Sequence, residues 1–308
     1  LIGLGVVQTP NTMLFLCLLV GASSVSVQVL IPLAAHLSSD EKRGQVLGNI
    51  MAGLLLGILL ARPVASIIAD HFGWRAVFFF AAGCMVFIAL VIYFAIPTRL
   101  PTHKTRYFAL LRSLKSLVIS QPVLRQRAFY QGLMFASFSL FWTTVPVVLA
   151  REYGFSQTQI ALFALVGAAG AVAAPIVGRL ADKGYTYEMS LLAKVIALLC
   201  FLPSLFDLPN GIIILALTGV LIDFAVQANM VLGQRVIYSL EPQSRARLNA
   251  IYMTSIFLGG AVGSLIASSL YEFGGWESIA LVAAAMPLIA LIGFVYSAKK
   301  EKQKAHTA

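Results

Sequence analysis

The sequence predicts an all-α membrane protein built from two similar halves, and two observations carry this prediction. Hydrophobic residues make up 59% of the 308 residues and charged residues only 11%, whereas soluble domains carry about a quarter charged residues. In addition, the stretch 43–74 recurs at 245–276, and such a repeat in an apolar chain indicates two halves in the same orientation. Chance similarity between two helices is the alternative.

Both copies of the repeat begin at a charged cluster and end at a Gly-Trp turn. Identical residues in the two copies are Arg43 and Arg245, Met51 and Met253, Gly57 and Gly259, Ala65 and Ala267, Ser66 and Ser268, Gly73 and Gly275, and Trp74 and Trp276. The segment between cluster and turn is apolar over about 25 residues, enough to cross a ~30 Å hydrocarbon core as a helix. Each copy therefore predicts one spanning helix with both ends marked.

Apolar runs of about 20 residues or more, the length that spans a bilayer, occur nine times. They cover residues 12–37, 45–69, 75–96, 128–150, 157–181, 187–207, 211–236, 248–271 and 277–298. Residues 1–7 form a stub that is too short to span. Because more chain precedes the second repeat copy than the first, we expect about 75 further residues before Leu1. The expected architecture is two six-helix halves, truncated so that the first two helices and most of the third are missing.

The basic residues indicate the orientation. Since spans alternate sides, 19 of the 22 Lys and Arg fall in one set of loops and ends, Arg75 and Arg151 fall in the other, and Arg62 lies within a span. Lys194, two turns into its span, is counted with the larger set. The positive-inside rule places that set in the cytoplasm, together with the C-terminus. Topology thus accounts for the net charge of +10, and no nucleic-acid partner is predicted.

Three domains are predicted: a truncated N-terminal helical half over residues 1–96, a basic cytoplasmic linker over 97–127, and a C-terminal six-helix half over 128–308. The linker contains seven Lys and Arg and no acid. Its apolar residues at helical spacing are Tyr107, Leu111, Leu114 and Val118. This pattern predicts an amphipathic helix on the cytoplasmic leaflet. A solvated linker is the alternative.

Two six-helix halves, a basic central linker and cytoplasmic ends resemble the major facilitator superfamily. The superfamily's cytoplasmic signature is similar to Gly178-Arg179-Leu180-Ala181-Asp182-Lys183. The resemblance implies a cytoplasmic gate, in which Asp182 approaches the N-terminus of a neighbouring helix while Arg179 and Lys183 bind carboxylates. The sequence departs from the signature at Gly184, which comes one place early and is not followed by the basic pair.

The span 45–69 and the turn Gly73-Trp74-Arg75 resemble the antiporter signature of the superfamily's drug/proton branch. Four positions of this signature are Gly, Pro, Gly and Gly. In this sequence they are occupied by Ala61, Arg62, Ala65 and Ser66, so small residues replace the glycines. Small residues still let two helix backbones approach closely. In the preceding span, Cys17 stands where an arginine would precede Gly21. The resemblance implies proton-coupled efflux.

Asp223 is the first candidate for proton coupling. It lies about 12 residues into its span, near the bilayer midplane, where a short acid cannot reach the interface. Gln227 follows one helical turn later on the same face and is a cavity candidate. The alternative is a hydrogen-bonded acid that only fixes helix packing. Arg62 is the second coupling candidate, although its long side chain could instead extend to the extracellular interface.

Other cavity candidates are polar or aromatic residues within the spans. They are Ser24, Gln28, Phe138, Trp142 and Asn249. Ser24 and Gln28 are four residues apart on one helix face, and plain helix-to-helix hydrogen bonding is an equal alternative for them. Phe138 and Trp142 belong to an aromatic stripe that could hold a lipophilic substrate, or could equally serve packing or lipid contact.

No phosphate loop, His/Cys cluster or nucleophile elbow occurs, so the sequence predicts no enzyme, catalytic residue, cofactor or metal site. We expect a secondary active transporter of a small organic molecule, working by proton-coupled efflux and alternating access. Its partners would be that substrate, protons and the lipid bilayer, and it would be a monomer in a plasma or bacterial inner membrane. A sugar or organic-acid facilitator or symporter, and a truncated remnant that does not transport, are the alternatives.

Overall fold

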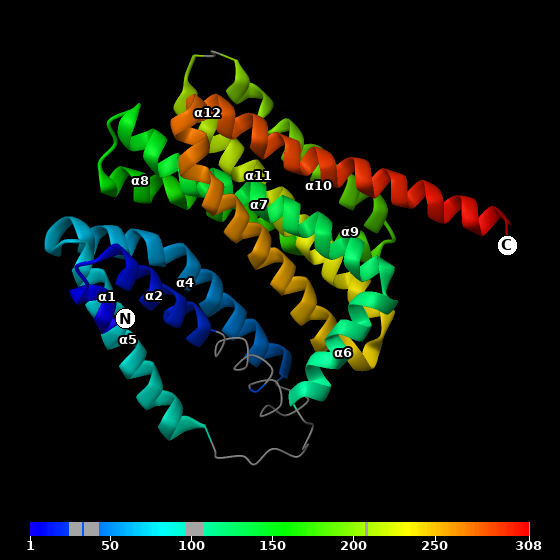
Figure 1. Cartoon of the computed structure of the whole chain (residues 1–308), viewed down its shortest axis with the longest axis horizontal. Coiled ribbons are helices and arrows are strands. Elements are labelled where there is room, and N and C mark those ends of the chain that lie inside the picture. Colours follow the sequence, from blue (N-terminus) through cyan, green and yellow to red (C-terminus); the bar gives the residue numbers. More distant parts are fainter. Residues whose placement is uncertain (25–32, 34–42, 97–106, 207–208, 308) are drawn as a thin grey trace. The chain divides into compact units, whose positions relative to one another are not determined.

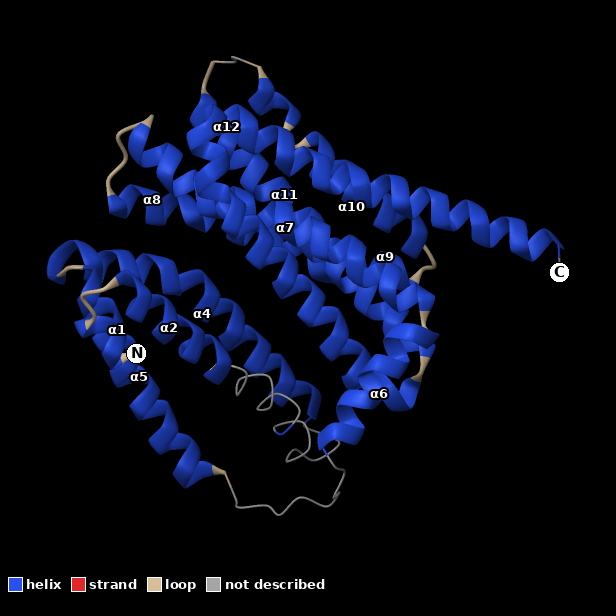
Figure 2. Ribbon diagram, viewed as in Figure 1, coloured by secondary structure: helices blue, strands red, loops and turns tan. Residues whose placement is uncertain are grey.

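The computed structural model describes residues 1–24, 33, 43–96, 107–206 and 209–307, and every regular element in these ranges is helical. The predicted all-α class is therefore confirmed for this part of the chain (Figures 1 and 2). Contacts group the chain into two units. One is Leu1–Thr102 with Ser156–Leu162, and the other is His103–Phe155 with Phe163–Ala308.

The first unit contains α1 (Ile2–Val6), α2 (Pro10–Ser23), α4 (Arg43–Phe72) and α5 (Trp74–Ala95). The predicted stub at residues 1–7 forms the short helix α1, which packs on α5 through the buried side chain of Leu4. A Cβ on Gly5 would lie 2.6 Å from the ring of Phe79, so this approach requires a glycine. Arg75 Nη2 donates to the carbonyl oxygen of Val7 at 3.3 Å.

The second unit contains most of the remaining helices. They are α6 (Tyr107–Ser120), α7 (Pro122–Arg151), η1 (Leu165–Val172), α9 (Ala173–Asp182), α10 (Thr186–Leu199), η2 (Leu202–Leu205), α11 (Gly211–Leu240), η3 (Pro242–Ser244) and α12 (Arg245–Thr307). The helix α8 (Gln157–Ala164) is divided between the units. Helices α7, α10, α11 and α12 pack together and form the body of the second unit (Figure 1).

Both predicted Gly-Trp turns are present. Gly73 separates α4 from α5 with a φ of 81°, and Gly275 interrupts α12 with a φ of 60°. A Cβ at either position would meet nothing within 4 Å. The turns therefore require glycine because of the positive φ and not because of crowding. The break at Gly274 and Gly275 divides α12 into two helical segments, as the repeat predicts.

Five of the described helical segments are long and apolar enough to cross a membrane. They are Trp74–Ala95, Pro122–Arg151, Thr186–Leu205, Gly211–Leu240 and the interrupted segment Arg245–Lys300. The predicted span 157–181 is instead divided into α8, η1 and α9, and the span 12–37 is described only in part, as α2. Large apolar side chains on α12, such as Leu265 and Phe273, are 78% and 89% exposed, which suits a surface that faces lipid.

The helix predicted within the basic linker is present as α6. Its buried residue is Leu117, which lies outside the predicted apolar stripe and packs with Leu124 of α7 and Leu248 of α12. Arg125 Nη1 donates to the carbonyl oxygen of Ile119 at 2.6 Å and so satisfies an unpaired group at the end of α6. Protein contacts therefore hold one face of this helix.

Helix α7 and the first segment of α12 approach each other closely. A Cβ on Gly259 would overlap the backbone of Gly132, and a Cβ on Gly263 would lie 3.0 Å from the carbonyl carbon of Ala136. These two glycines are four residues apart, so they lie on one face of the helix. Small residues at this spacing let two membrane helices approach backbone to backbone.

We predict that Gly259→Ala lowers the free energy of unfolding by about 1–3 kcal/mol, because the new methyl group meets backbone that cannot move aside. The matched control is Gly83→Ala in α5, where a Cβ meets nothing within 4 Å. The control should be neutral or stabilising by up to about 1 kcal/mol. Thermal unfolding of the purified variants in detergent measures both effects, and equal melting temperatures would contradict the assignment of this contact.

Candidate functional site

Asp223 lies near the middle of α11 and is half-buried. Trp142 of α7 donates its indole N–H to Oδ1 of Asp223 at 2.7 Å. The ring of Trp142 is itself packed against Phe163 of α8, with the ring centroids 6.4 Å apart. Two residues that the sequence names separately, Asp223 and Trp142, are thus brought together by three segments of the chain.

The short segment η1 covers Asp223. A Cβ on Gly170 would overlap the Asp223 side chain and would lie 2.7 Å from the backbone nitrogen of Phe224. A Cβ on Gly167 would overlap Oδ2 of Asp223. The η1 backbone therefore lies directly on the acid, and it can do so because both positions are glycine. A 3₁₀ segment inside a longer helical run often marks a hinge, because its hydrogen bonds have poorer geometry.

The aromatic residues of α7 contact two different helices. Phe138 stacks on Phe135 with centroids 5.0 Å apart and an interplanar angle of 26°, and Phe135 packs against Gly260 of α12. Trp142 is turned instead toward α11 and Asp223. Gln227, one turn after Asp223, is half-buried.

A second polar cluster surrounds Lys194, which has no exposed surface. Its Nζ donates to the carbonyl oxygen of Ser190 at 3.0 Å and to Oδ1 of Asn229 at 2.6 Å. Asn229 in turn donates to Oε1 of Gln131 at 2.5 Å, and Gln131 donates to the carbonyl oxygen of Val226 at 3.2 Å. A buried charge requires such compensation, because removing it from water is costly.

Aromatic rings complete the surroundings of Lys194. Its Nζ lies 4.3 Å from the ring centroid of Phe294 and 5.6 Å from that of Tyr130. A second cation, Arg127, lies over Phe294 at 5.2 Å and donates to the hydroxyl of Ser190 at 3.1 Å. The negative faces of aromatic rings stabilise cations that are removed from water.

The cluster around Lys194 was missed by the sequence analysis, which counted this residue among the cytoplasmic cations. The structure buries it between α7, α10, α11 and α12 instead of extending it to the membrane surface. The sequence could have indicated the burial of Lys194, because this residue lies two turns inside an apolar span. An ionisable residue there is rare and needs a partner. The partners themselves are far apart in the sequence and carry no common motif.

The segment predicted to form a cytoplasmic gate makes an ion pair with α11, whereas the predicted contact of Asp182 was a helix N-terminus. Arg235 of α11 donates to Oδ1 of Asp182, at the end of α9. A Cβ on Gly178 would meet nothing within 4 Å, and the side chains of Arg179 and Lys183 are exposed. Gly184, the residue that departs from the family signature, has a φ of 96° and ends the helix. The early glycine therefore supplies the tight turn.

Asn249 and Ser24 also make hydrogen bonds. Asn249 Oδ1 accepts hydrogen bonds from Tyr238 at 2.8 Å and from Gln234 at 3.3 Å. Ser24 donates to the carbonyl oxygen of Val20 within its own helix at 2.8 Å. Arg62 belongs to α4, but its side chain is outside the described part, and Gln28 lies outside the described residues.

Comparison with known proteins adds a family and two relatives. The family model described as Major Facilitator Superfamily matches residues 1–215 and 127–308. The "Uncharacterized transporter YgaY" of Escherichia coli O157:H7 is 41% identical over 275 residues, which cover 89% of this chain and 70% of the relative. The "Probable transporter SCO4007" of Streptomyces coelicolor is 30% identical over 267 residues, which cover 86% of this chain and 61% of the relative.

The cluster around Lys194 leads to a prediction about stability. Asn229→Leu should lower the free energy of unfolding by about 3–5 kcal/mol, because the ammonium stays buried with one partner fewer. Lys194→Met should cost less, about 1–3 kcal/mol, because the charge leaves together with its donor. Unfolding titrations in mixed micelles test the order, and the double variant should be less destabilised than the sum of the two. A larger loss for Lys194→Met than for Asn229→Leu would refute this account.

Proposed function

Because the chain belongs to the major facilitator superfamily, it is a membrane transporter and not an enzyme, and we propose that it exports a small organic molecule in exchange for protons. The resemblance of the span 45–69 and its Gly-Trp-Arg turn to the drug/proton branch supports the direction and the coupling ion. The proposal includes a monomer of two halves, residues 1–96 and 128–308, joined by the basic linker 97–127. It would lie in a bacterial inner membrane.

One observation carries the proposal: a carboxylate inside a spanning helix, Asp223, is held by Trp142 and covered by the glycine-containing segment η1. The indole N–H fixes the orientation of the acid. Movement of η1 would uncover it, and Gly167 and Gly170 leave only backbone to be displaced. In alternating access such an acid takes up a proton on one side of the membrane and releases it on the other.

Residues on the side of α7 that contacts α12 support a substrate with an apolar body and a few polar groups. Phe135 and Phe138 stack on one side of α7. Ser264 of α12 exchanges hydrogen bonds with Ser139 at 2.7 Å and with Thr143 at 3.1 Å. A mixed apolar and hydroxyl surface of this kind suits small organic molecules. The ion pair between Asp182 and Arg235 would close the cytoplasmic side in our proposal.

A facilitator or symporter of sugars or organic acids is the second candidate. It is favoured by the loss of the signature glycines in the span 45–69, where Ala61 and Ser66 stand in glycine places. The two candidates differ in the direction of proton-driven flux. When a pH gradient is imposed, a proton-coupled exporter moves its substrate in the direction opposite to the protons. A symporter moves substrate and protons in the same direction.

The proposed orientation places the C-terminal tail in the cytoplasm, because 18 of the 22 basic residues fall in the loops and ends assigned to that side when the buried Lys194 is left out. We expect green fluorescent protein fused after Ala308 to fluoresce in a bacterial host and alkaline phosphatase fused there to be inactive. The matched control is fusion after Gly154, in the turn between α7 and α8, where the phosphatase should be active and the fluorescent protein dark. The reverse pattern would overturn the side assigned to every loop.

Substitution of Asp223 tests the coupling. Asparagine keeps the acceptor for Trp142 but removes the titrating group, so Asp223→Asn should reduce gradient-driven flux by roughly tenfold or more while substrate exchange continues. The assay uses the complete product of the gene in proteoliposomes, with ethidium as the first probe substrate. Glu188→Gln, at an exposed acid in the first turn of α10, is the matched control and should transport normally.

Two results would contradict this role. Undiminished gradient-driven flux in Asp223→Asn would mean that another group carries the proton, and Arg62 would be tested next. Loss of both exchange and folded protein would assign Asp223 to helix packing. Thermal unfolding of the same preparation distinguishes the second result from a loss of coupling alone.

A further inference from the structure

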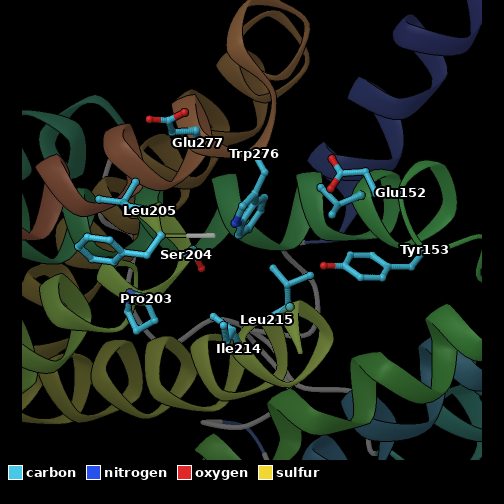
Figure 3. Close-up of a pocket in the computed structure, with 12 residues that line it drawn as sticks. Glu152, Tyr153, Pro203, Ser204, Leu205, Ile214, Leu215, Trp276 and Glu277 are labelled. Atoms are coloured by element: carbon cyan, nitrogen blue, oxygen red, sulfur yellow. The ribbon is translucent and has the colours of Figure 1, made fainter. Parts of the chain in front are cut away.

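A pocket of about 310 Å³ opens at one end of the second unit. It lies where α7 ends, α11 begins and the two segments of α12 meet (Figure 3). Arg235, which pairs with Asp182, is near the other end of α11. The volume of the pocket falls within the range of small-molecule pockets, roughly 300–1,000 Å³. It shares no lining residue with the Asp223 site.

Apolar side chains form part of the wall of this pocket. Val148 and Leu215 are buried, 1% and 3% exposed, and both line it. Trp276 contributes its ring, which is held edge-on by Phe141 with the centroids 5.9 Å apart. Figure 3 shows Trp276 above Ile214 and Leu215, with the space between them. Apolar side chains such as these offer a contact surface for the apolar body of a ligand.

Ser204 supplies a polar group that the protein itself does not satisfy. Its Oγ is buried and has no hydrogen-bond partner among the described residues. A buried hydroxyl without a partner is unfavourable, and such groups in native proteins call for an explanation. A ligand in the pocket that donates a hydrogen bond to this oxygen would satisfy it.

The charged side chains among the described residues that line the pocket are acidic. Glu152 and Glu277 line it, and the described lining residues include no Lys, Arg or His. The hydroxyl of Tyr271 donates to Oε1 of Glu152 at 2.9 Å and so orients this carboxylate. The nearby cation Arg151 lies over the ring of Tyr271, 5.8 Å from its centroid, and is not among the lining residues.

The hydroxyl of Tyr153 faces the pocket from the side of Glu152 (Figure 3). It lies so close to Gly211 that a Cβ there would overlap it. The aromatic rings of Tyr153 and Trp276 therefore border the same space as the two carboxylates. Aromatic faces and carboxylates together attract organic cations.

From these contacts we propose that the pocket binds a protonated primary or secondary amine that carries an apolar body. The ammonium group pairs with Glu152 and donates an N–H to Ser204, and the apolar body lies against Val148, Leu215 and Trp276. An anion would meet two carboxylates, and a quaternary ammonium has no N–H to donate. The site is separate from the proposed proton-coupling group, so it adds a binding function to the transporter.

Binding of phenethylammonium to the purified protein, measured by equilibrium dialysis, tests this proposal. We expect saturable binding, with phenylacetate and trimethylphenethylammonium each weaker by on the order of tenfold. Glu152→Gln and Ser204→Ala should each weaken phenethylammonium binding by several-fold or more. The matched control Glu272→Gln removes an exposed acid from the same region that does not line the pocket, and it should bind phenethylammonium as the unsubstituted protein does.

Three outcomes would overturn the proposal. They are equal binding of phenylacetate, unchanged phenethylammonium binding in both pocket variants, and an equal loss in Glu272→Gln, which would indicate only general surface charge. Asp223→Asn distinguishes this pocket from the transport site, because phenethylammonium binding should survive that substitution. Loss of binding there would assign the amine to the transport site. Thermal unfolding of each variant shows that the fold is retained.

Discussion

The buried ammonium of Lys194 is the constraint on which the second unit depends. A charge with no exposed surface must be compensated by the protein, since its removal from water costs several kcal/mol. The compensation comes from four helices: a carbonyl of α10, Asn229 of α11, and the rings of Tyr130 and Phe294 from α7 and α12. One buried amino group therefore links four helices that otherwise present mostly apolar surfaces to one another.

Glycines make these contacts possible. Tyr130 reaches its place beside Lys194 because Gly293 of α12 leaves room for its ring, where a Cβ would lie 2.9 Å from the nearest ring carbon. Farther along, Gly132 and Gly259 bring α7 and the first segment of α12 into backbone contact. Apolar packing between membrane helices gains little from the hydrophobic effect, because lipid is equally apolar. Close backbone approach and polar contacts therefore carry much of the specificity here.

The sequence predicted the features that depend on local periodicity. Apolar run lengths gave the spans of α5, α7, α11 and α12, and the repeat gave the positive-φ turns at Gly73 and Gly275. It did not predict that η1 interrupts one span, nor that Asn229 and Gln131 meet Lys194. Those contacts join residues on different helices, and their pairing is set by tertiary packing. Asp223 was identified from its depth in the span, but its pairing with Trp142 and its cover by η1 required the structure.

The two buried polar centres differ in a way that bears on their roles. Lys194 is held by hydrogen bonds to Ser190 and Asn229 and by aromatic rings on two further helices, so moving any one of them leaves a charge uncompensated. Asp223 is covered on one side only by the backbone of a 3₁₀ segment with two glycines. Exposing Asp223 therefore requires the displacement of a short segment with weak internal hydrogen bonds, whereas exposing Lys194 requires the bundle to separate. In the proposed mechanism, in which Asp223 gains and loses its cover, the cluster around Lys194 would hold the bundle together while η1 moves.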